Sequence, residues 1–295
     1  MKKKFLALIT AAAMVISLAG CGGTSSSSGG EQSEGENGEN PDTTTIAFST
    51  WTGYAPFFVA RDAGIFEKNG VDVTLTIMES ASDKKAAMAA GQIDGVAETV
   101  DTSTMSLAAG QDHVQVLALD TSYGGDGVVA KKENTSITDL KGKQVALDTS
   151  GGASIFYFNY LLKENNMTME DVDVQNMSSG DAGAAFVGGN VDAAVTWEPW
   201  LTKAKETDFG TVLADSSTAP GVIVDTLNFS SEFIEKYPNT VQKIVDSWYE
   251  AVDYYNNNTD ESVDMMAKGF SMDADDFKDT LSTIKYYGKE ENVDY

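Results

Sequence analysis

Apolar and polar positions along the chain change period repeatedly, and these changes predict short strands joined by helices. Residues 44–49, "TTIAFS", form a short apolar run, and residues 71–77, "VDVTLTI", alternate between apolar and polar. Both patterns are typical of strands. Between them, residues 55–70 carry apolar side chains at helical spacing, namely Phe57, Phe58, Ala60, Ala63, Ile65 and Phe66. The opening of the ordered chain therefore predicts a strand, a helix and a strand.

The same order recurs in two blocks. In the first block, strands are predicted at 93–98 and 114–120 after helices at 82–92 and 102–110, with Ser82 and Asp83 at the helix start and Gly91 at its end. In the second, residues 136–148 lead into a strand, further strands are predicted at 172–177 and 191–196, and helices are predicted between them at 152–166 and 181–190. Alternation of this kind predicts an α/β fold with largely parallel sheets.

After Pro220 the pattern is extended over residues 221–230, and a long helix is predicted from Ser231. Its apolar face contains Phe233, Ile234, Tyr237, Val241, Ile244, Val245, Trp248 and Val252. This periodicity indicates packing against a core.

The N-terminus has a different character. Residues 1–20 join three lysines to an apolar stretch too short to span a bilayer comfortably, which predicts a signal peptide. Cys21 is the only cysteine, and "LAGC" resembles a bacterial lipobox, in which the cysteine is lipidated after cleavage. Residues 21–44 are rich in glycine, serine and glutamate and predict a flexible linker. Order is expected from about Thr45, which leaves 251 residues.

The formal net charge is −25, and it becomes −28 without the three lysines near the N-terminus. Phosphate contact needs a basic surface, so the balance argues against nucleic-acid binding. The sequence has no second hydrophobic span. We therefore expect a soluble body, exported and held by lipid at the outer face of the cell membrane.

Six segments together resemble the solute-binding lipoproteins of ABC importers, in the nitrate, taurine and aliphatic sulfonate group, which also resembles thiamine-pyrimidine synthases. They occur in the same order, at 51–73, 86–110, 116–132, 137–162, 188–204 and 233–248. The match includes "WTGYAPFFVARDAGIFEKNGVDV" and "GGNVDAAVTWEPWLTKA". It covers nearly the whole ordered chain.

The resemblance implies a two-lobed periplasmic-binding-protein-like fold of type II, with ligand bound between the lobes. We expect residues 45–130 and 224–295 to form lobe 1 and residues 131–223 to form lobe 2. Crossing segments are expected at 124–132 and 222–229. The implied partners are a small-molecule ligand and an ABC permease with its ATPase, and the protein is expected to be a monomer. Members of the group usually continue with further helices, whereas this chain stops at "KEENVDY", which indicates a fragment or a shortened member.

Ligands of parallel α/β sheets bind beyond the carboxyl ends of the strands. This rule nominates five loops, at 49–54, 97–102, 120–127, 148–154 and 196–200. The candidate ligand-binding residues in them are Ser49, Trp51, Tyr54, Glu98, Asp101, Ser122, Tyr123, Asp126, Ser150, Gly152, Trp197 and Glu198.

Each loop also has a purely structural interpretation. Trp51 would suit a core, and Asp101 would suit the N-cap of the helix at 102–110. The glycines of 124–127 would serve a turn. The loop at 148–154 offers free backbone N–H groups to an anion, although ordinary helix capping explains it nearly as well.

The charges of the candidates indicate a ligand class. Arg61 is the only arginine and falls on a predicted helix, so no guanidinium is available for a sulfonate or nitrate. Four carboxylates, of Glu98, Asp101, Asp126 and Glu198, fall on loops expected to converge. Because buried unpaired carboxylates are costly, we expect a ligand with a cationic group, enclosed by Trp51, Tyr54, Tyr123 and Trp197.

Catalysis is not expected. The single histidine, His113, precedes a strand and is predicted to be an exposed turn residue. Without cysteines beyond Cys21 or a second histidine, the sequence predicts neither a metal site nor a cofactor. The predicted function is delivery of a small nitrogen- or sulfur-containing organic solute to a permease. The alternatives are binding of a pyrimidine precursor of thiamine and a sensory receptor that does not transport.

Overall fold

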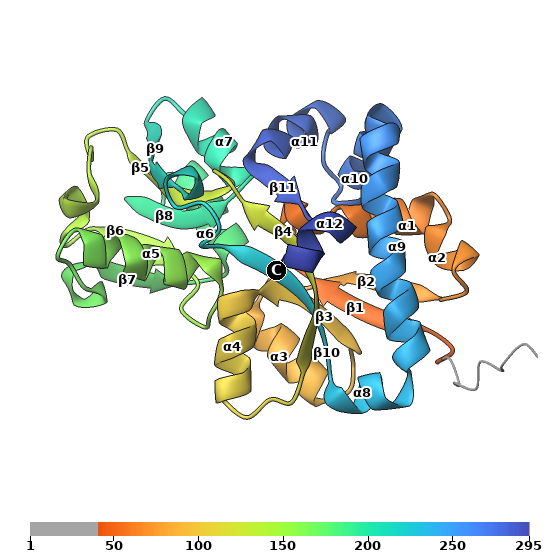
Figure 1. The fold of residues 1–295 in the computed structure, drawn as a ribbon. Coiled ribbons are helices and arrows are strands. Elements are labelled where there is room, and N and C mark those ends of the chain that lie inside the picture. Colours follow the sequence, from red (N-terminus) through yellow and green to blue (C-terminus); the bar gives the residue numbers. More distant parts are fainter. Residues whose placement is uncertain (1–40, 295) are drawn as a thin grey trace, which may run out of the picture. The chain divides into compact units, whose positions relative to one another are not determined.

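Two mixed β-sheets organise the chain (Figure 1). The structure is a computed structural model and describes residues 41–294. The predicted signal peptide, Cys21 and most of the predicted linker lie outside the described residues. Among the described residues, no helix has the length and apolar character that a membrane span requires.

The first sheet has the strand order β11-β4-β10-β3-β1-β2. Its strands are β1 (Thr44–Phe48), β2 (Val73–Ile77), β3 (Gly95–Thr99), β4 (Val114–Ser122), β10 (Val224–Phe229) and β11 (Ile284–Tyr286). The second sheet has the order β7-β6-β8-β5-β9. Its strands are β5 (Asp126–Lys131), β6 (Gln144–Leu147), β7 (Asp173–Asn176), β8 (Ala193–Trp197) and β9 (Gly210–Asp215).

The sheets share one plan, which confirms the predicted repeat. In the first, β1 lies parallel between β2 and β3, and in the second, β6 lies parallel between β7 and β8. The prediction of largely parallel sheets is wrong, because β10 and β5 each run antiparallel to both neighbours. The chain passes from the first sheet to the second between β4 and β5, and back between β9 and β10. The strand that follows each passage, β5 or β10, is the one that runs antiparallel to its neighbours.

Helices lie at the positions that the apolar pattern indicates, and the structure adds four helices that the sequence did not predict. The α-helices are α1 (Pro56–Asp62), α2 (Ile65–Lys68), α3 (Ala81–Ala89), α4 (Val100–Ala108), α5 (Ala153–Glu164), α6 (Ser179–Val187), α7 (Trp200–Glu206), α8 (Ser231–Lys236), α9 (Pro238–Asn257), α10 (Thr259–Gly269), α11 (Ala274–Thr280) and α12 (Lys289–Asp294). The four that the sequence did not predict are α7, α10, α11 and α12. Short 3₁₀ helices are η1 (Thr52–Tyr54), η2 (Ile137–Leu140), η3 (Met169–Asp171), η4 (Ser216–Thr218) and η5 (Leu281–Thr283).

Two predicted helices are interrupted. The helix expected over 55–70 breaks between α1 and α2, where Gly64 has φ 72°, a left-handed conformation that favours glycine. The helix expected from Ser231 breaks at Tyr237, because a residue before proline is disfavoured in the helical region and Pro238 begins α9. The start of α3 is also earlier than predicted, since Ser80 accepts from the Asp83 N–H.

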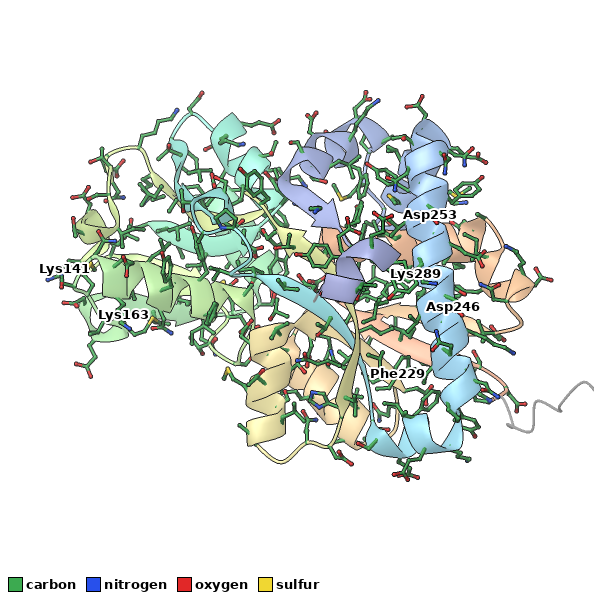
Figure 2. All side chains as sticks on the ribbon, in the orientation of Figure 1. Lys141, Lys163, Phe229, Asp246, Asp253 and Lys289 are labelled. Atoms are coloured by element: carbon green, nitrogen blue, oxygen red, sulfur yellow. The ribbon has the colours of Figure 1, made fainter. Side chains whose placement is uncertain are left out.

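The cores follow from these helices. Phe48 of β1 packs with Phe57 of α1, whose ring lies 4.7 Å from that of Trp248 in α9, measured between centroids. Phe229 of β10 is fully buried, whereas Asp246 and Asp253 lie exposed on α9 (Figure 2). In the second sheet, successive residues face two different cores: Val128 packs on the α5 side and Val129 on the side of α6 and α7. Burial on both faces explains the apolar runs of the inner strands β5, β6 and β8.

Strand pairing also bears on the expected crossings. The chain leaves the first sheet after Ser122 and enters the second at Asp126, and it returns between Asp215 and Val224. Residues 126–130, which the sequence assigned to lobe 1, thus pair within the second sheet. The lobe boundaries themselves stay a prediction.

Candidate functional site

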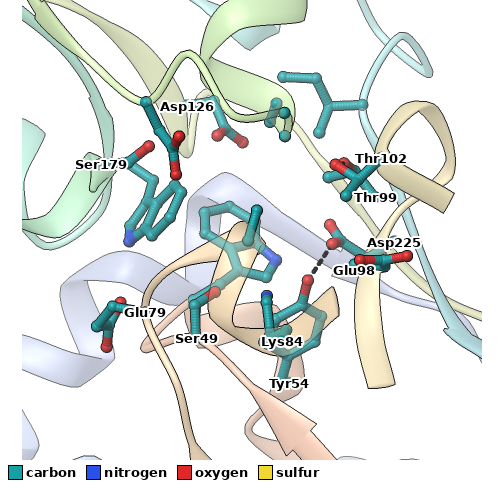
Figure 3. A pocket seen from close by; sticks show the side chains of 18 residues that line it. Ser49, Tyr54, Glu79, Lys84, Glu98, Thr99, Thr102, Asp126, Ser179 and Asp225 are labelled. Carbon is teal, nitrogen blue, oxygen red and sulfur yellow. Dashed lines mark hydrogen bonds between the residues drawn. The ribbon is translucent and has the colours of Figure 1, made fainter. Parts of the chain in front are cut away.

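One pocket is lined by residues from the ends of strands in both sheets (Figure 3). Seven of the twelve predicted residues line it: Ser49, Trp51, Tyr54, Glu98, Asp126, Gly152 and Trp197. Ser49 follows β1, and Trp197 ends β8. The position agrees with the general rule that ligands bind beyond the carboxyl ends of parallel strands.

The pocket is small. Its empty space amounts to about 490 Å³, including the part open to solvent. The pocket therefore suits a compact solute in this conformation.

Two aromatic walls are fixed by carboxyl groups on the strands beneath them. The Trp51 indole Nε1 donates to Asp120 Oδ1 at 3.0 Å, and the Tyr54 hydroxyl donates to Asp225 Oδ1. Trp51 is also a core residue with 4% exposure, so its core and pocket interpretations hold together. The ring positions are consequently determined before any ligand arrives.

The carboxyl groups at the pocket are shielded from water. Burial raises the pKa of Asp126 to about 7, against a hydrogen bond from Ser122 that lowers it. Burial also raises the pKa of Asp225 to about 8, although the Tyr54 hydrogen bond acts in the opposite direction. For Glu98, burial raises the pKa and Lys84 lowers it. None of the three carboxyl groups has an ion-pair partner within 4.0 Å among the described residues. The pocket can thus accept a positive group.

Several lining residues were not among the sequence candidates, notably Glu79, Lys84, Thr99, Thr102, Asp148, Ser179 and Asp225. Glu79 and Ser179 follow β2 and β7, so the strand-end rule applied to those strands would have found them. Lys84 lies on α3, and Asp225 lies inside the antiparallel strand β10. No local sequence signal identifies these two.

Five predicted residues are not among those lining the pocket. Tyr123 is 53% exposed, so the expected aromatic enclosure lacks this ring. The Ser122 hydroxyl contacts Ser216 Oγ at 2.7 Å, and the Ser150 hydroxyl donates to Asp148 Oδ1 at 2.6 Å. Asp101 lies in the first turn of α4, which begins at Val100, so it is not the N-cap residue.

Glu198, the fifth, has its carboxylate turned onto the start of α7. Glu198 Oε2 accepts from the Thr202 N–H and Oε1 accepts from the Thr202 hydroxyl, both at 3.0 Å. Burial raises the pKa of this carboxyl, while the hydrogen bonds from Thr202 lower it. The two hydrogen bonds give the Glu198 carboxylate a helix-capping role, and its contact with a ligand stays a prediction.

The prediction that His113 is exposed is wrong. His113 is 5% exposed, and its Nε2 lies 2.8 Å from the Ser103 hydroxyl, which donates to Asn228 Oδ1 at 2.9 Å. Because the Ser103 proton is directed to Asn228, His113 Nε2 must donate to Ser103. This network joins α4 to β10. Within residues 41–294, no group of three or more His, Cys, Asp or Glu side chains is placed to hold a metal ion.

Comparison with known proteins gives the class and the family. The fold resembles solved periplasmic binding proteins, including the aliphatic sulphonate binding protein SsuA from Escherichia coli (TM-score 0.69, 21% identity, 86% of this chain and 89% of that one). It also resembles the nitrate-binding protein NrtA from Synechocystis PCC 6803 (TM-score 0.66, 18% identity, 81% and 70%). The chain therefore has the periplasmic-binding-protein fold, which confirms the predicted fold class.

A model of the NMT1-like family matches residues 37–268, and the chain belongs to this family. A Bacillus subtilis (strain 168) protein named for the binding of aliphatic sulfonates is 25% identical over 276 residues, which is 90% of this chain and 77% of that protein. These similarities confirm the resemblance stated from the sequence.

Proposed function

We propose that the protein is an extracytoplasmic solute-binding protein of an ABC importer. Its ligand is a small nitrogen- or sulfur-containing organic solute that carries a cationic group. The observation that carries this proposal is the pocket between strand ends of both sheets, with two fixed aromatic rings and buried carboxyl groups without ion-pair partners. A desolvated cation gains both from carboxylates and from aromatic faces.

The names of similar proteins support the same class. The Bacillus subtilis relative is named for binding aliphatic sulfonates, and the neighbours in structure are a sulphonate-binding and a nitrate-binding protein. Taurine joins a sulfonate to an ammonium group, so it suits both these names and the acidic pocket.

The remaining parts of the proposal rest on the sequence. Residues 45–130 with 224–295 and residues 131–223 act as two lobes that close on the solute, without a cofactor. Cys21 carries the lipid that holds a monomeric body at the outer face of the membrane. Closure requires that the solute bind the closed state more tightly than the open state.

A thermal-shift screen of the purified protein tests the proposal. The panel contains taurine, alkyl sulfonates, nitrate, aminopyrimidines and small amines. A solute that binds only the folded state raises the melting temperature with its concentration. Shifts by amine-bearing solutes are expected, and shifts confined to inorganic anions would overturn the cationic ligand. A shift confined to aminopyrimidines would instead favour the thiamine-precursor alternative.

A further inference from the structure

Lys84 is a buried cation without a close partner. The residue is 5% exposed and lines the pocket, and Figure 3 shows its side chain entering beside Tyr54 and Ser49. Its backbone N–H donates to the Ser80 carbonyl oxygen, but its ammonium group has neither a hydrogen bond nor an ion pair within 4.0 Å among residues 41–294. A buried ammonium group in this condition is costly, so a partner from outside the chain would stabilise it.

The neighbouring lysine shows the contrast. Lys85 does not line the pocket, and its Nζ donates to the Ser150 carbonyl oxygen at 3.3 Å. The two adjacent lysines of α3 thus differ: Lys85 is half-buried and its ammonium group bonds to the chain, whereas Lys84 is buried and its ammonium group has no hydrogen bond.

A second donor in the pocket is also unused. Trp197 Nε1 is buried and has no hydrogen-bond partner among the described residues. Buried indole N–H groups normally have an acceptor. Two free donors of different chemistry therefore point to an acceptor that arrives with the ligand.

The same pocket holds the carboxyl groups already described, and Asp126 lies across the view from Lys84 in Figure 3. Resting on the proposed solute-binding function, we propose that the solute is a zwitterion whose anionic group binds the Lys84 ammonium and whose cationic group binds the acidic side of the pocket. Each charged group of the ligand then meets a group of opposite charge in the pocket. A solute that carries only one of the two charges would leave one pocket group unpaired and bind more weakly.

A structural role for Lys84 is the competing account. Glu98, Asp225, Glu79 and Asp148 all attract the ammonium group and raise its pKa, although burial, the larger effect, lowers it. Lys84 could therefore serve only to balance these carboxylates. If Lys84 binds the anionic group of the solute, removing its charge should weaken only ligands that carry an anionic group. If Lys84 only balances the carboxylates, removing its charge should affect ligands with and without an anionic group alike.

Calorimetric titration of the full chain with three matched probes separates them. The probes are taurine, 2-aminoethanol, which lacks the sulfonate, and 2-hydroxyethanesulfonate, which lacks the ammonium. The wild type is expected to bind taurine at least about tenfold more tightly than either analogue. Lys84→Met should weaken taurine binding by about tenfold or more and leave 2-aminoethanol unchanged or tighter. Lys85→Met is the matched control and should change neither.

Lys84→Arg keeps the charge and should retain more taurine affinity than Lys84→Met, which also guards against a folding defect in the Met variant. Equal loss of taurine and 2-aminoethanol in Lys84→Met, or equal binding of both by the wild type, would overturn the zwitterion. If taurine does not bind, the best solute of the thermal-shift panel replaces it, together with its analogue lacking the anionic group. A best solute without an anionic group overturns this inference alone, whereas no binding by any panel member overturns the proposed function as well.

Discussion

Asp120 and Asp225 lie opposite each other across the antiparallel pair β4–β10, and Asp225 lines the pocket. Each accepts a hydrogen bond from one aromatic wall, Asp120 from Trp51 and Asp225 from Tyr54. Burial raises the pKa of both carboxyl groups, and that of Asp120 is raised further by Asp225. The two carboxyl groups hold the two aromatic rings in place. Because they are buried and close together, ionising both at once is unfavourable.

Stability should therefore fall as the pH rises. The folded pKa of Asp225, about 8, exceeds the value of about 3.9 for an unfolded aspartate, so the folded state binds more protons between these values. The stabilisation is fully present below about pH 4 and is lost as the pH rises through the folded pKa. Asp225→Asn, which stays neutral, should be more stable than the wild type by more than about 1 kcal/mol at pH 8.5 and show a flatter profile from pH 5 to 8.5.

Urea unfolding across this pH range measures the difference. Asp264→Asn, on the exposed side of α10, is the control and should keep the wild-type slope. A wild-type free energy of unfolding that rises from pH 5 to 8.5 would contradict the buried, protonated Asp225.

Ligand binding should show the opposite dependence on pH. The Asp126 carboxyl has a pKa of about 7, and only its ionised form attracts a cation. The ionised fraction grows about tenfold between pH 6 and 8, so the affinity for taurine should rise by up to about tenfold. Asp126→Asn should remove most of this dependence and weaken binding at pH 8. Calorimetry in buffers of different ionisation enthalpy should detect proton release in the wild type, and its absence would contradict the assignment.

Much of the fold could be predicted because the βαβ pattern is local in sequence. The strands β1, β2, β3, β6, β7 and β8 follow from apolar runs or from alternation of apolar and polar residues. The sequence did not predict β9, whose residues are mostly half-buried, which weakens the signal. The antiparallel placement of β5 and β10 depends on pairing between distant segments, which periodicity does not encode.

The site was predictable to the extent that it consists of strand ends. Trp51, Glu98 and Trp197 fall under that rule, whereas Lys84 reaches the pocket from a helix. Asp225 meets Tyr54 across 171 residues of sequence, and only the tertiary structure brings them together. Glu198 satisfied the rule, yet the N–H and hydroxyl groups of Thr202 hold its carboxylate.

Glu198→Gln tests this assignment of Glu198. Glutamine keeps one acceptor oxygen for the Thr202 N–H, and its NH₂ group can donate to the Thr202 hydroxyl in place of the bond that Glu198 Oε1 accepts. Both hydrogen bonds then lack the carboxylate charge, which should cost about 0.5–1.5 kcal/mol in stability. Taurine affinity should stay within about twofold of the wild type. Thr202→Val is the matched variant from the other side of the contact, and the two changes should be non-additive in unfolding experiments. A tenfold loss of affinity in Glu198→Gln would show that the carboxylate reaches the ligand.

Gly125 lies where the chain passes from β4 to β5 and supports the Trp51 wall from outside the pocket. Its carbonyl oxygen accepts from the Glu198 N–H at 2.8 Å, and a Cβ added to it would lie 2.5 Å from Trp51 Cη2. Gly125→Ala should therefore displace the indole, destabilise the fold by about 1–3 kcal/mol and lower taurine affinity, although Gly125 does not line the pocket.

Introducing Gly125→Ala into a Trp51→Ala variant tests whether the clash with Trp51 causes the loss of stability. In a Trp51→Ala chain the added methyl group has lost its main obstacle, so Gly125→Ala should cost much less stability there than in the wild type. Gly288→Ala is the control, because its Cβ would meet Glu291 Oε2 at 3.4 Å, an ordinary contact. If Gly125→Ala costs the same stability in both chains, the strain arises instead from the Thr283 carbonyl oxygen, which lies 3.1 Å from the added Cβ. Gly125 would then not support the Trp51 ring.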